Sequence, residues 1–140
     1  MADIKDKKEE EIKKIAQKYS LELLLLFGSR AEKQNKYVRE DSDFDIAYLS
    51  KKDLNLMDEA RMSGELAKIF ESSQIDIVNI KRSSPLLMKQ IFDNHIILYC
   101  KDKIVYYKYM IYFQRRYAEA GPLFSLRDNS IKVFLKKHAR

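Results

Sequence analysis

The sequence predicts one α/β or α+β domain, with a mixed sheet of about four strands flanked by helices and a helical C-terminal tail. The first reason is that segments with helical apolar spacing alternate along the chain with short apolar runs typical of strands. The second is length, because 140 residues suffice to bury one core. The third is the absence of internal repeats and low-complexity segments.

The first two elements are a charged helix and an apolar strand. Residues 3–19 predict a helix, because the apolar positions recur at helical spacing: Ile12, Ile15, Ala16 and Tyr19. Residues 21–27 are a continuous apolar run that ends at Gly28, which is typical of a strand buried on both faces. We expect a short helix from Arg30 and a polar loop over residues 33–42.

Residues 43–49 alternate and therefore predict a second strand. One face would carry Asp43, Asp45, Ala47 and Leu49, and the other Phe44, Ile46 and Tyr48. A helix is expected from about Asp53, with Met62, Leu66, Ile69 and Phe70 on its buried side. Residues 75–80 predict the third strand.

Helix-capping residues, turns and helix-breaking residues predict the remaining elements. Ser84 and Pro85 are a capping serine and a first-turn proline, so a helix should begin there and run to about Phe92. A turn at residues 93–94 leads to a fourth strand over residues 95–100. Residues 104–120 predict a helix that stops at Gly121-Pro122, with a further short helix over residues 130–137.

Charge divides the chain into two parts. Residues 101–140 carry ten Lys and Arg against three acidic residues, whereas residues 1–100 carry a net charge of −1. We therefore expect a catalytic or binding domain over residues 1–100. Residues 101–140 would be a basic, tyrosine-rich helical extension that packs on the domain or on a partner.

The sequence also predicts a reducing, cytoplasmic location. Cys100 is the only cysteine, so no intramolecular disulfide or cysteine metal cluster can form. The N-terminus has no apolar stretch typical of a signal peptide. No apolar run approaches the roughly 20 residues of a membrane-spanning helix.

Three aspartates predict a metal site. Asp43 and Asp45 are two residues apart on a strand and share a face, so their charges repel unless a cation lies between them. Asp76 is the only carboxylate in an apolar strand. Placed beside the other two, it would complete a site for two Mg²⁺ ions, which steadies the attacking and leaving oxygens of a phosphoryl displacement.

The turn after the first strand predicts phosphate binding. Gly28 allows a ligand to approach the backbone, and the helix start that follows presents free N–H groups to phosphates. Ser29 could hydrogen-bond the terminal phosphates, and Arg30 could reach them as a forked donor. Each motif alone has a plainer explanation, as a simple turn, a solvated strand end or a sheet edge. Their order along the chain favours a nucleotidyltransferase.

These residues carry a family resemblance. Residues 23–31 (LLLLFGSRA) and 41–47 (DSDFDIA) closely resemble the DNA polymerase β-like nucleotidyltransferase superfamily. Residues 75–80, 84–87 and 96–99 resemble the second half of its short members, the minimal nucleotidyltransferases (MNT antitoxins). The chain departs from the pattern at residues 32–40, a longer link without glycine, where we expect a lengthened helix or loop.

The resemblance implies a role for each site residue. Gly28, Ser29 and Arg30 would bind the triphosphate of ATP. Asp43 and Asp45 would hold the magnesium ions. Asp76 would ligate the metal next to the acceptor hydroxyl and help to remove its proton. The reaction would transfer AMP and release pyrophosphate.

The resemblance also implies the acceptor, a HEPN-domain ribonuclease toxin modified on a tyrosine by its antitoxin. The chain has too little length after residue 100 for an acceptor-binding domain, and it has no HEPN motif Arg-x-x-x-x-His. It would thus be the antitoxin. Two alternatives stay open: an antitoxin that neutralises by binding alone, and a transferase acting on a small molecule or an RNA end.

The tail and the histidine have plainer explanations. Tyr and Arg in residues 106–117 are favoured at interfaces, but an amphipathic helix packed on its own domain explains them equally well. Nucleic-acid binding is less favoured, because the basic residues form no compact motif. We expect His95 to begin a strand and to have no role in the chemistry.

Overall fold

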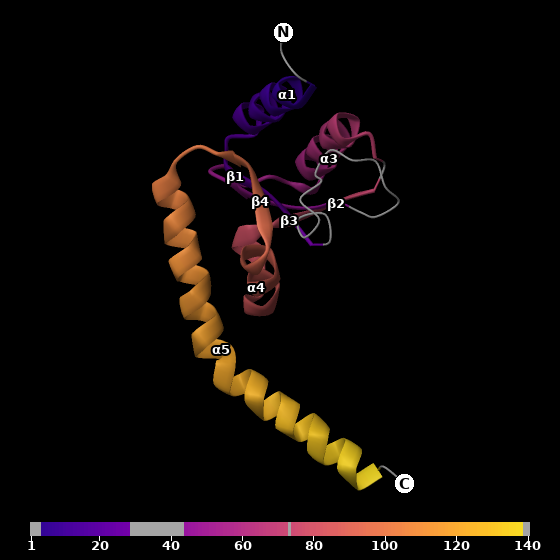
Figure 1. Cartoon of the computed structure of the whole chain (residues 1–140), viewed down its shortest axis with the longest axis vertical. Helices are drawn as coiled ribbons and strands as arrows, with labels where there is room; N and C mark the ends of the chain where they lie inside the picture. The colour runs from indigo at the N-terminus through magenta and orange to yellow at the C-terminus, as the bar shows by residue number, and fades with distance from the viewer. Residues whose placement is uncertain (1–3, 29–43, 73, 139–140) are drawn as a thin grey trace.

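Four strands form one mixed sheet in the order β3-β2-β1-β4 (Figure 1). Their bounds are β1 (Leu21–Phe27), β2 (Phe44–Ser50), β3 (Ile75–Asn79) and β4 (His95–Cys100). The computed structural model describes residues 4–28, 44–72 and 74–138. Strand β1 is antiparallel to β2 and β4, while β2 and β3 are parallel. The end of β1 therefore meets the starts of the other three strands at one end of the sheet.

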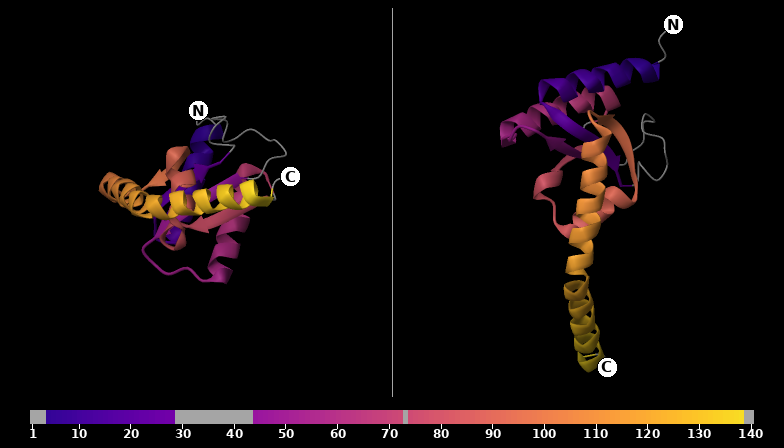
Figure 2. Two further views of the ribbon diagram at one scale, coloured as in Figure 1. Left: turned by 90° about the horizontal axis from the view of Figure 1, so that it is seen from below. Right: turned by 90° about the vertical axis from the view of Figure 1, so that its left-hand side faces the viewer.

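Helices cover both faces of this sheet (Figures 1 and 2). Helices α1 (Ile4–Lys18) and α3 (Leu56–Phe70) pack on one face around the larger apolar cluster. Helix α4 (Pro85–Asp93) and the first part of α5 (Lys103–His138) pack on the other face. The short 3₁₀ turn η1 (Ile80–Arg82) follows β3. The predicted fold class, a four-stranded mixed sheet flanked by helices, is confirmed.

The prediction that β1 is buried on both faces is confirmed. Leu24 and Leu26 belong to the α1/α3 cluster, and Leu23 and Leu25 to the α4/α5 cluster. All four side chains are fully buried. A continuous apolar run is stable here because helices cover both sides of the strand. The same strand thus anchors both layers.

The predicted alternation of β2 is confirmed for the residues described. Phe44, Ile46 and Tyr48 pack in the α1/α3 cluster, whereas Ala47 and Leu49 pack in the α4/α5 cluster. Asp45 lies between Phe44 and Ile46 and is therefore directed to the α4 side. The expected strand start at Asp43 lies outside the described residues, as do the helix from Arg30 and the loop over residues 33–42.

Local capping sets the helix starts. Helix α3 begins at Leu56, a little later than expected, because Asn55 and Asp58 form a reciprocal capping box. Ser84 accepts a hydrogen bond from the Leu87 amide, and Pro85 occupies the first turn of α4, as predicted. Strand β3 ends at Asn79, where the expected last residue, Ile80, enters η1.

The expected stop of the last helix at Gly121-Pro122 is wrong. Helix α5 runs from Lys103 to His138 without a break and changes direction about half-way along (Figure 1). A proline inside a helix removes one backbone hydrogen bond and bends the helix, while the neighbouring turns keep theirs. The expected short helix over residues 130–137 is the last part of α5. No helix in the described part of the chain is long and apolar enough to span a membrane.

Candidate active site

Gly28 makes the turn that ends β1. Its φ of +79° lies in the left-handed region, which side chains other than hydrogen rarely adopt. A Cβ atom built at this position would lie 2.5 Å from Oδ2 of Asp45, closer than any van der Waals contact allows. The left-handed φ is therefore the main reason for glycine here, and a larger residue would also force the Asp45 carboxylate to shift. Its absent side chain lets the Asp45 carboxylate lie directly against the turn.

Four residues form a row across the sheet at this end. Asp76 of β3 pairs with Asp45 of β2, Asp45 pairs with Phe27 of β1, and Phe27 pairs with His95 of β4. Residues paired across neighbouring strands point to the same face of the sheet. The side chains of this row therefore all lie on the α4 side. The backbone register alone brings together two carboxylates that are 31 positions apart in the sequence.

The pairing of their strands places the two carboxylates of the row on neighbouring positions. Neighbouring strands are about 4.8 Å apart, and at that distance two unscreened negative charges repel. Asp45 is partly buried within the fold, whereas Asp76 is exposed and faces solvent. Carboxylate oxygens of this kind are the ligands that Mg²⁺ prefers. Among the described residues no group of three metal ligands occurs, and Asp43 lies outside them.

A shallow pocket opens beside the row. It has a volume of about 320 Å³ and is lined by Phe27, Gly28, Asp45, Gln90, Asp93 and Asn94. The last three come from the C-terminal end of α4, which reaches this edge because β4 begins beside the end of β1. The sequence pattern predicts only a turn at residues 93–94. Gln90 and Asn94 are four residues apart at the end of the helix, and this helical spacing was the available indication that both side chains lie on the same side.

His95, at the end of the row, has a structural role. Its Nδ1 lies 3.1 Å from the carbonyl oxygen of Phe92, so Nδ1 donates a proton there. Its Nε2, 2.7 Å from the Tyr106 hydroxyl, accepts the hydrogen bond from that group in the neutral ring. Burial lowers the pKa of His95 below its usual value, although its backbone hydrogen bonds oppose the shift. The imidazole therefore joins β4, α4 and α5 as a neutral group.

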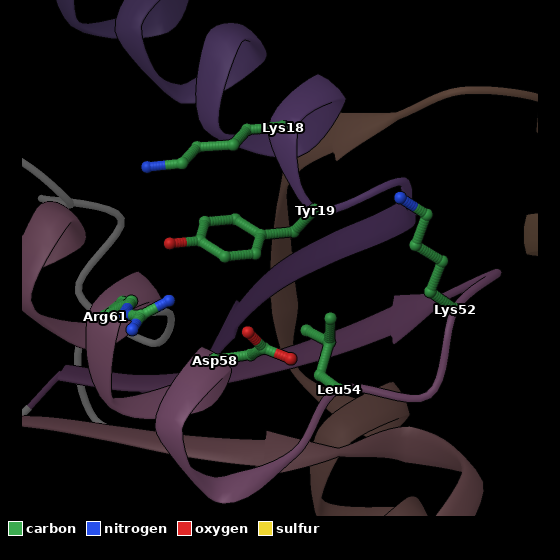
Figure 3. Close-up of a pocket in the computed structure, with 6 residues that line it drawn as sticks. All are labelled: Lys18, Tyr19, Lys52, Leu54, Asp58 and Arg61. Atoms are coloured by element: carbon green, nitrogen blue, oxygen red, sulfur yellow. The ribbon is translucent and has the colours of Figure 1, made fainter.

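The opposite end of the sheet has a pocket of its own (Figure 3). It measures about 270 Å³ and lies between the end of α1 and the start of α3. Its lining residues are Lys18, Tyr19, Lys52, Leu54, Asp58 and Arg61. Three of the six carry positive charge, so the pocket is a second candidate for an anionic ligand.

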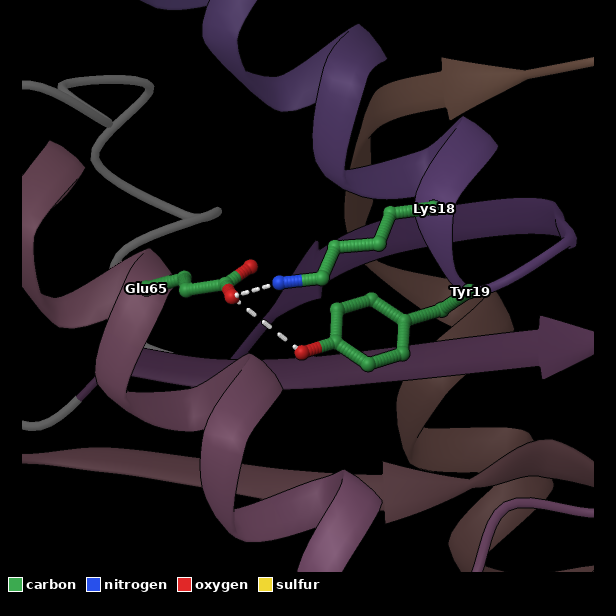
Figure 4. Close-up of polar contacts among 3 residues, drawn as sticks. All are labelled: Lys18, Tyr19 and Glu65. Atoms are coloured by element: carbon green, nitrogen blue, oxygen red, sulfur yellow. Dashed lines mark hydrogen bonds and ion pairs between the residues drawn. The ribbon is translucent and has the colours of Figure 1, made fainter.

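One of the positive charges at that second pocket, Lys18, is paired within the chain (Figure 4). Lys18 Nζ lies 2.5 Å from Oε1 of Glu65, and the Tyr19 hydroxyl donates to the same oxygen at 3.3 Å. The hydrogen bond to Glu65 raises the pKa of Lys18 above its usual value. These contacts join α1 to α3, so the pocket is best explained as a structural junction.

The structure brings together three of the predicted site residues. Gly28, Asp45 and Asp76 lie on adjacent strands at one end of the sheet. The other three, Ser29, Arg30 and Asp43, directly adjoin them in the sequence but lie outside the described residues. Their roles stay predictions.

Several solved structures resemble this chain. A toxin–antitoxin complex with AMP-PNP is 24% identical over 84% of this chain and 95% of that chain, with a TM-score of 0.62. An MNT antitoxin in complex with a tri-AMPylated HEPN toxin from Shewanella oneidensis is 24% identical over 84% and 93%, with a TM-score of 0.58. A candidate minimal nucleotidyltransferase is 25% identical over 68% and 95%, with a TM-score of 0.53. These likenesses support the fold.

The sequence comparisons assign the family. Curated protein sequences give no match to the chain. The profile of the family described as Polymerase beta, Nucleotidyltransferase matches residues 10–104, which span the whole sheet and both carboxylates of the row. The chain thus belongs to the polymerase beta nucleotidyltransferase family.

Proposed function

We propose that this protein is a Mg²⁺-dependent adenylyltransferase that moves AMP from ATP to a tyrosine of a HEPN-type toxin and acts as its antitoxin. The observation that carries the proposal is the register that places Asp45 beside Asp76, next to the left-handed turn at Gly28. Family membership supplies the class of reaction. The similar toxin–antitoxin structures, one with AMP-PNP and one with a tri-AMPylated toxin, support the nucleotide and the acceptor.

Each residue has a defined part in this proposal. Gly28 keeps the turn open to the triphosphate, and Ser29 and Arg30 donate hydrogen bonds to its terminal phosphates. Asp43, Asp45 and Asp76 would hold two Mg²⁺ ions. When bound, these ions would neutralise the negative charge that develops on the phosphate oxygens.

The transfer step itself is a displacement at the α-phosphorus. The tyrosine oxygen forms a bond to that atom while the bond to the β-phosphate oxygen breaks, and pyrophosphate leaves. Asp76, the solvent-facing member of the row, accepts the proton of the tyrosine hydroxyl. Asp45, held by the fold against Gly28, orients the nucleotide from the other side.

A protein acceptor agrees with the surface of α5. The first part of this helix exposes large apolar side chains whose exposed fractions run from 47% to 62%. They are Ile104, Tyr107, Ile111 and Tyr112. Their spacing of three, four and one places them along one side of the helix. Exposed large apolar side chains grouped on one side of a helix are typical of protein–protein contact.

The test is label transfer from ATP to the candidate toxin. The purified chain is incubated with Mg²⁺, α-labelled ATP and the product of the neighbouring gene, and the modified residue is mapped by mass spectrometry. We expect label on a tyrosine with the wild type and none with Asp45→Asn/Asp76→Asn. Glu65→Gln, which neutralises a carboxylate at the other end of the sheet, is the matched control and should transfer normally.

Three outcomes would contradict parts of the proposal. Equal transfer by the double variant would exclude the row as the active site. Full neutralisation of the toxin by the double variant would show an antitoxin that acts by binding alone. Label on a small molecule or RNA, with none on the toxin, would keep the transferase and replace its acceptor.

A further inference from the structure

The pocket beside the carboxylates has a polar wall that the catalytic roles leave unused. Gln90, Asp93 and Asn94 line it opposite Gly28 and Asp45. Neither amide side chain, Gln90 nor Asn94, has a hydrogen-bond partner within the described part of the chain. The volume of about 320 Å³ falls at the small end of the range for ligand sites, roughly 300–1,000 Å³. One small ligand group would fill it.

The strand order assigns this pocket to the nucleotide and not to the acceptor. Across the sheet the order is Asp76 on β3, Asp45 on β2, the Gly28 turn after β1, and then the end of α4 before β4. Asp76, which faces the acceptor in the proposed reaction, does not line the pocket. The pocket lies on the far side of Asp45, next to the turn that would hold the triphosphate.

The wall offers a hydrogen-bond acceptor to a nucleoside. The Asp93 carboxylate forms an ion pair with Lys89 through one of its oxygens. Its other oxygen can accept from a hydroxyl or amino group. The ribose and base of a nucleotide carry those donors.

The two amides favour adenine among the bases. Gln90 and Asn94 are four residues apart at the end of α4 and lie on one side of it. A carboxamide has a donor and an acceptor side by side, and this pair matches the amino group and ring nitrogen on an edge of adenine. On the edge that carries N7, guanine has two acceptors in place of that pair.

We propose that the C-terminal end of α4 is the nucleoside-binding wall of the site, where Gln90 and Asn94 select adenine and Asp93 accepts from the nucleoside. This inference rests on the proposed function for the presence of a nucleotide, and it adds the residues that choose the base. Selection of the base is a task that neither the catalytic aspartates nor the Gly28 turn performs in the proposed reaction.

The test measures binding without chemistry. AMP-PNP and GMP-PNP are titrated calorimetrically with Mg²⁺ into the wild type, Gln90→Ala, Asn94→Ala and the double variant. The wild type should prefer AMP-PNP, and each single change should weaken AMP-PNP binding about tenfold with little effect on GMP-PNP. Gln17→Ala, an exposed helix glutamine on α1, is the matched control and should bind like the wild type.

Other results separate this inference from the proposed function. Unchanged AMP-PNP affinity in the double variant would overturn the inference, as would a rise confined to the KM for the protein acceptor. Selective binding by the wild type without any transfer would leave the inference standing and overturn the proposed reaction. If the alanine variants do not fold, Gln90→Glu and Asn94→Asp keep the side-chain size, remove an NH₂ donor and should likewise lose adenine preference.

Discussion

The two ends of the sheet differ in how they place charged side chains on neighbouring elements. At the Lys18 end, Lys18 and Tyr19 both bind Glu65, and the Ser50 hydroxyl donates to the Tyr19 carbonyl at 2.8 Å. At the Gly28 end, Asp45 and Asp76 are paired in register with like charge. One end joins elements of the chain to each other, and the other places repelling groups side by side.

The difference indicates where a ligand is needed. Opposite charges that meet within the chain lower the free energy of the folded state without outside help, although exposed pairs do so weakly. Like charges held together raise it, unless a cation binds between them. We therefore propose that the Gly28 end serves function, whereas the Lys18 and Tyr19 contacts with Glu65 at the other end join α1 to α3.

The largest effect should come from neutralising one carboxylate at the Gly28 end. Asp45→Asn should lower nucleotide transfer by about 10³-fold, because several kcal/mol of charge stabilisation in the transition state are lost. The free energy of unfolding should change far less, since asparagine has nearly the same size and keeps one oxygen that accepts hydrogen bonds. Transfer kinetics and urea unfolding measure the two effects. A variant that is inactive only because it is unfolded would contradict this division.

Two glycines test the geometry of the turn. Gly28→Ala should destabilise the chain by at least about 1–2 kcal/mol, because φ is +79° and the new Cβ would meet Asp45. Gly64→Ala, inside α3 with no atom within 4 Å of the new Cβ, should stabilise it by about 0.5–1 kcal/mol. Urea unfolding of both variants checks the opposite signs. A stable, active Gly28→Ala variant would exclude the tight turn.

A smaller effect should appear with pH at His95. Because its pKa in the folded state lies below the usual 6.5, the unfolded chain takes up the proton first as pH falls. The contribution of neutral His95 to stability is therefore complete above about pH 6.5 and is lost as pH decreases below it. Unfolding measured from pH 7.5 to 5.5 should show this loss in the wild type and in His138→Gln. The slope of the free energy of unfolding against pH should be smaller in His95→Gln. An equal slope in that variant would show that another group causes the pH dependence.

The smallest effect should follow from neutralising a carboxylate at the Lys18 end. Glu65→Gln removes the charge opposite Lys18 but keeps an oxygen for the Tyr19 hydroxyl. Because Lys18 is well exposed, the thermal midpoint should fall only slightly, and less so at high salt. Nucleotide transfer should not change. A clear loss of transfer would give this end a functional role.

The sequence predicted the parts of the fold that depend on local pattern. The apolar run of β1, the alternation of β2 and the Ser84-Pro85 cap each fix their own element, and the structure confirms them. The path of α5 through Gly121-Pro122 was missed, since a proline inside a helix can bend it without ending it. Local signals at that point do not distinguish a stop from a bend.

The candidate site was predictable only where residue type indicates chemistry. Asp45 and Asp76 were proposed as site residues because carboxylates are uncommon in apolar strands, and the register places them at paired positions. Gln90 and Asn94 gave no such indication, because polar residues at a helix end are ordinary. Their position beside Gly28 follows from the pairing of β1 with β4, a long-range contact that no local pattern specifies.

Binding of AMP-PNP with and without Mg²⁺ tests the central claim most directly, that the Asp45–Asp76 pair is a metal–nucleotide site. Calorimetry is performed on the wild type and Asp45→Asn in Mg²⁺ and in EDTA. We predict strong binding by the wild type in Mg²⁺ only, and its loss in Asp45→Asn. Equal binding in EDTA, or binding unchanged by the substitution, would contradict the claim.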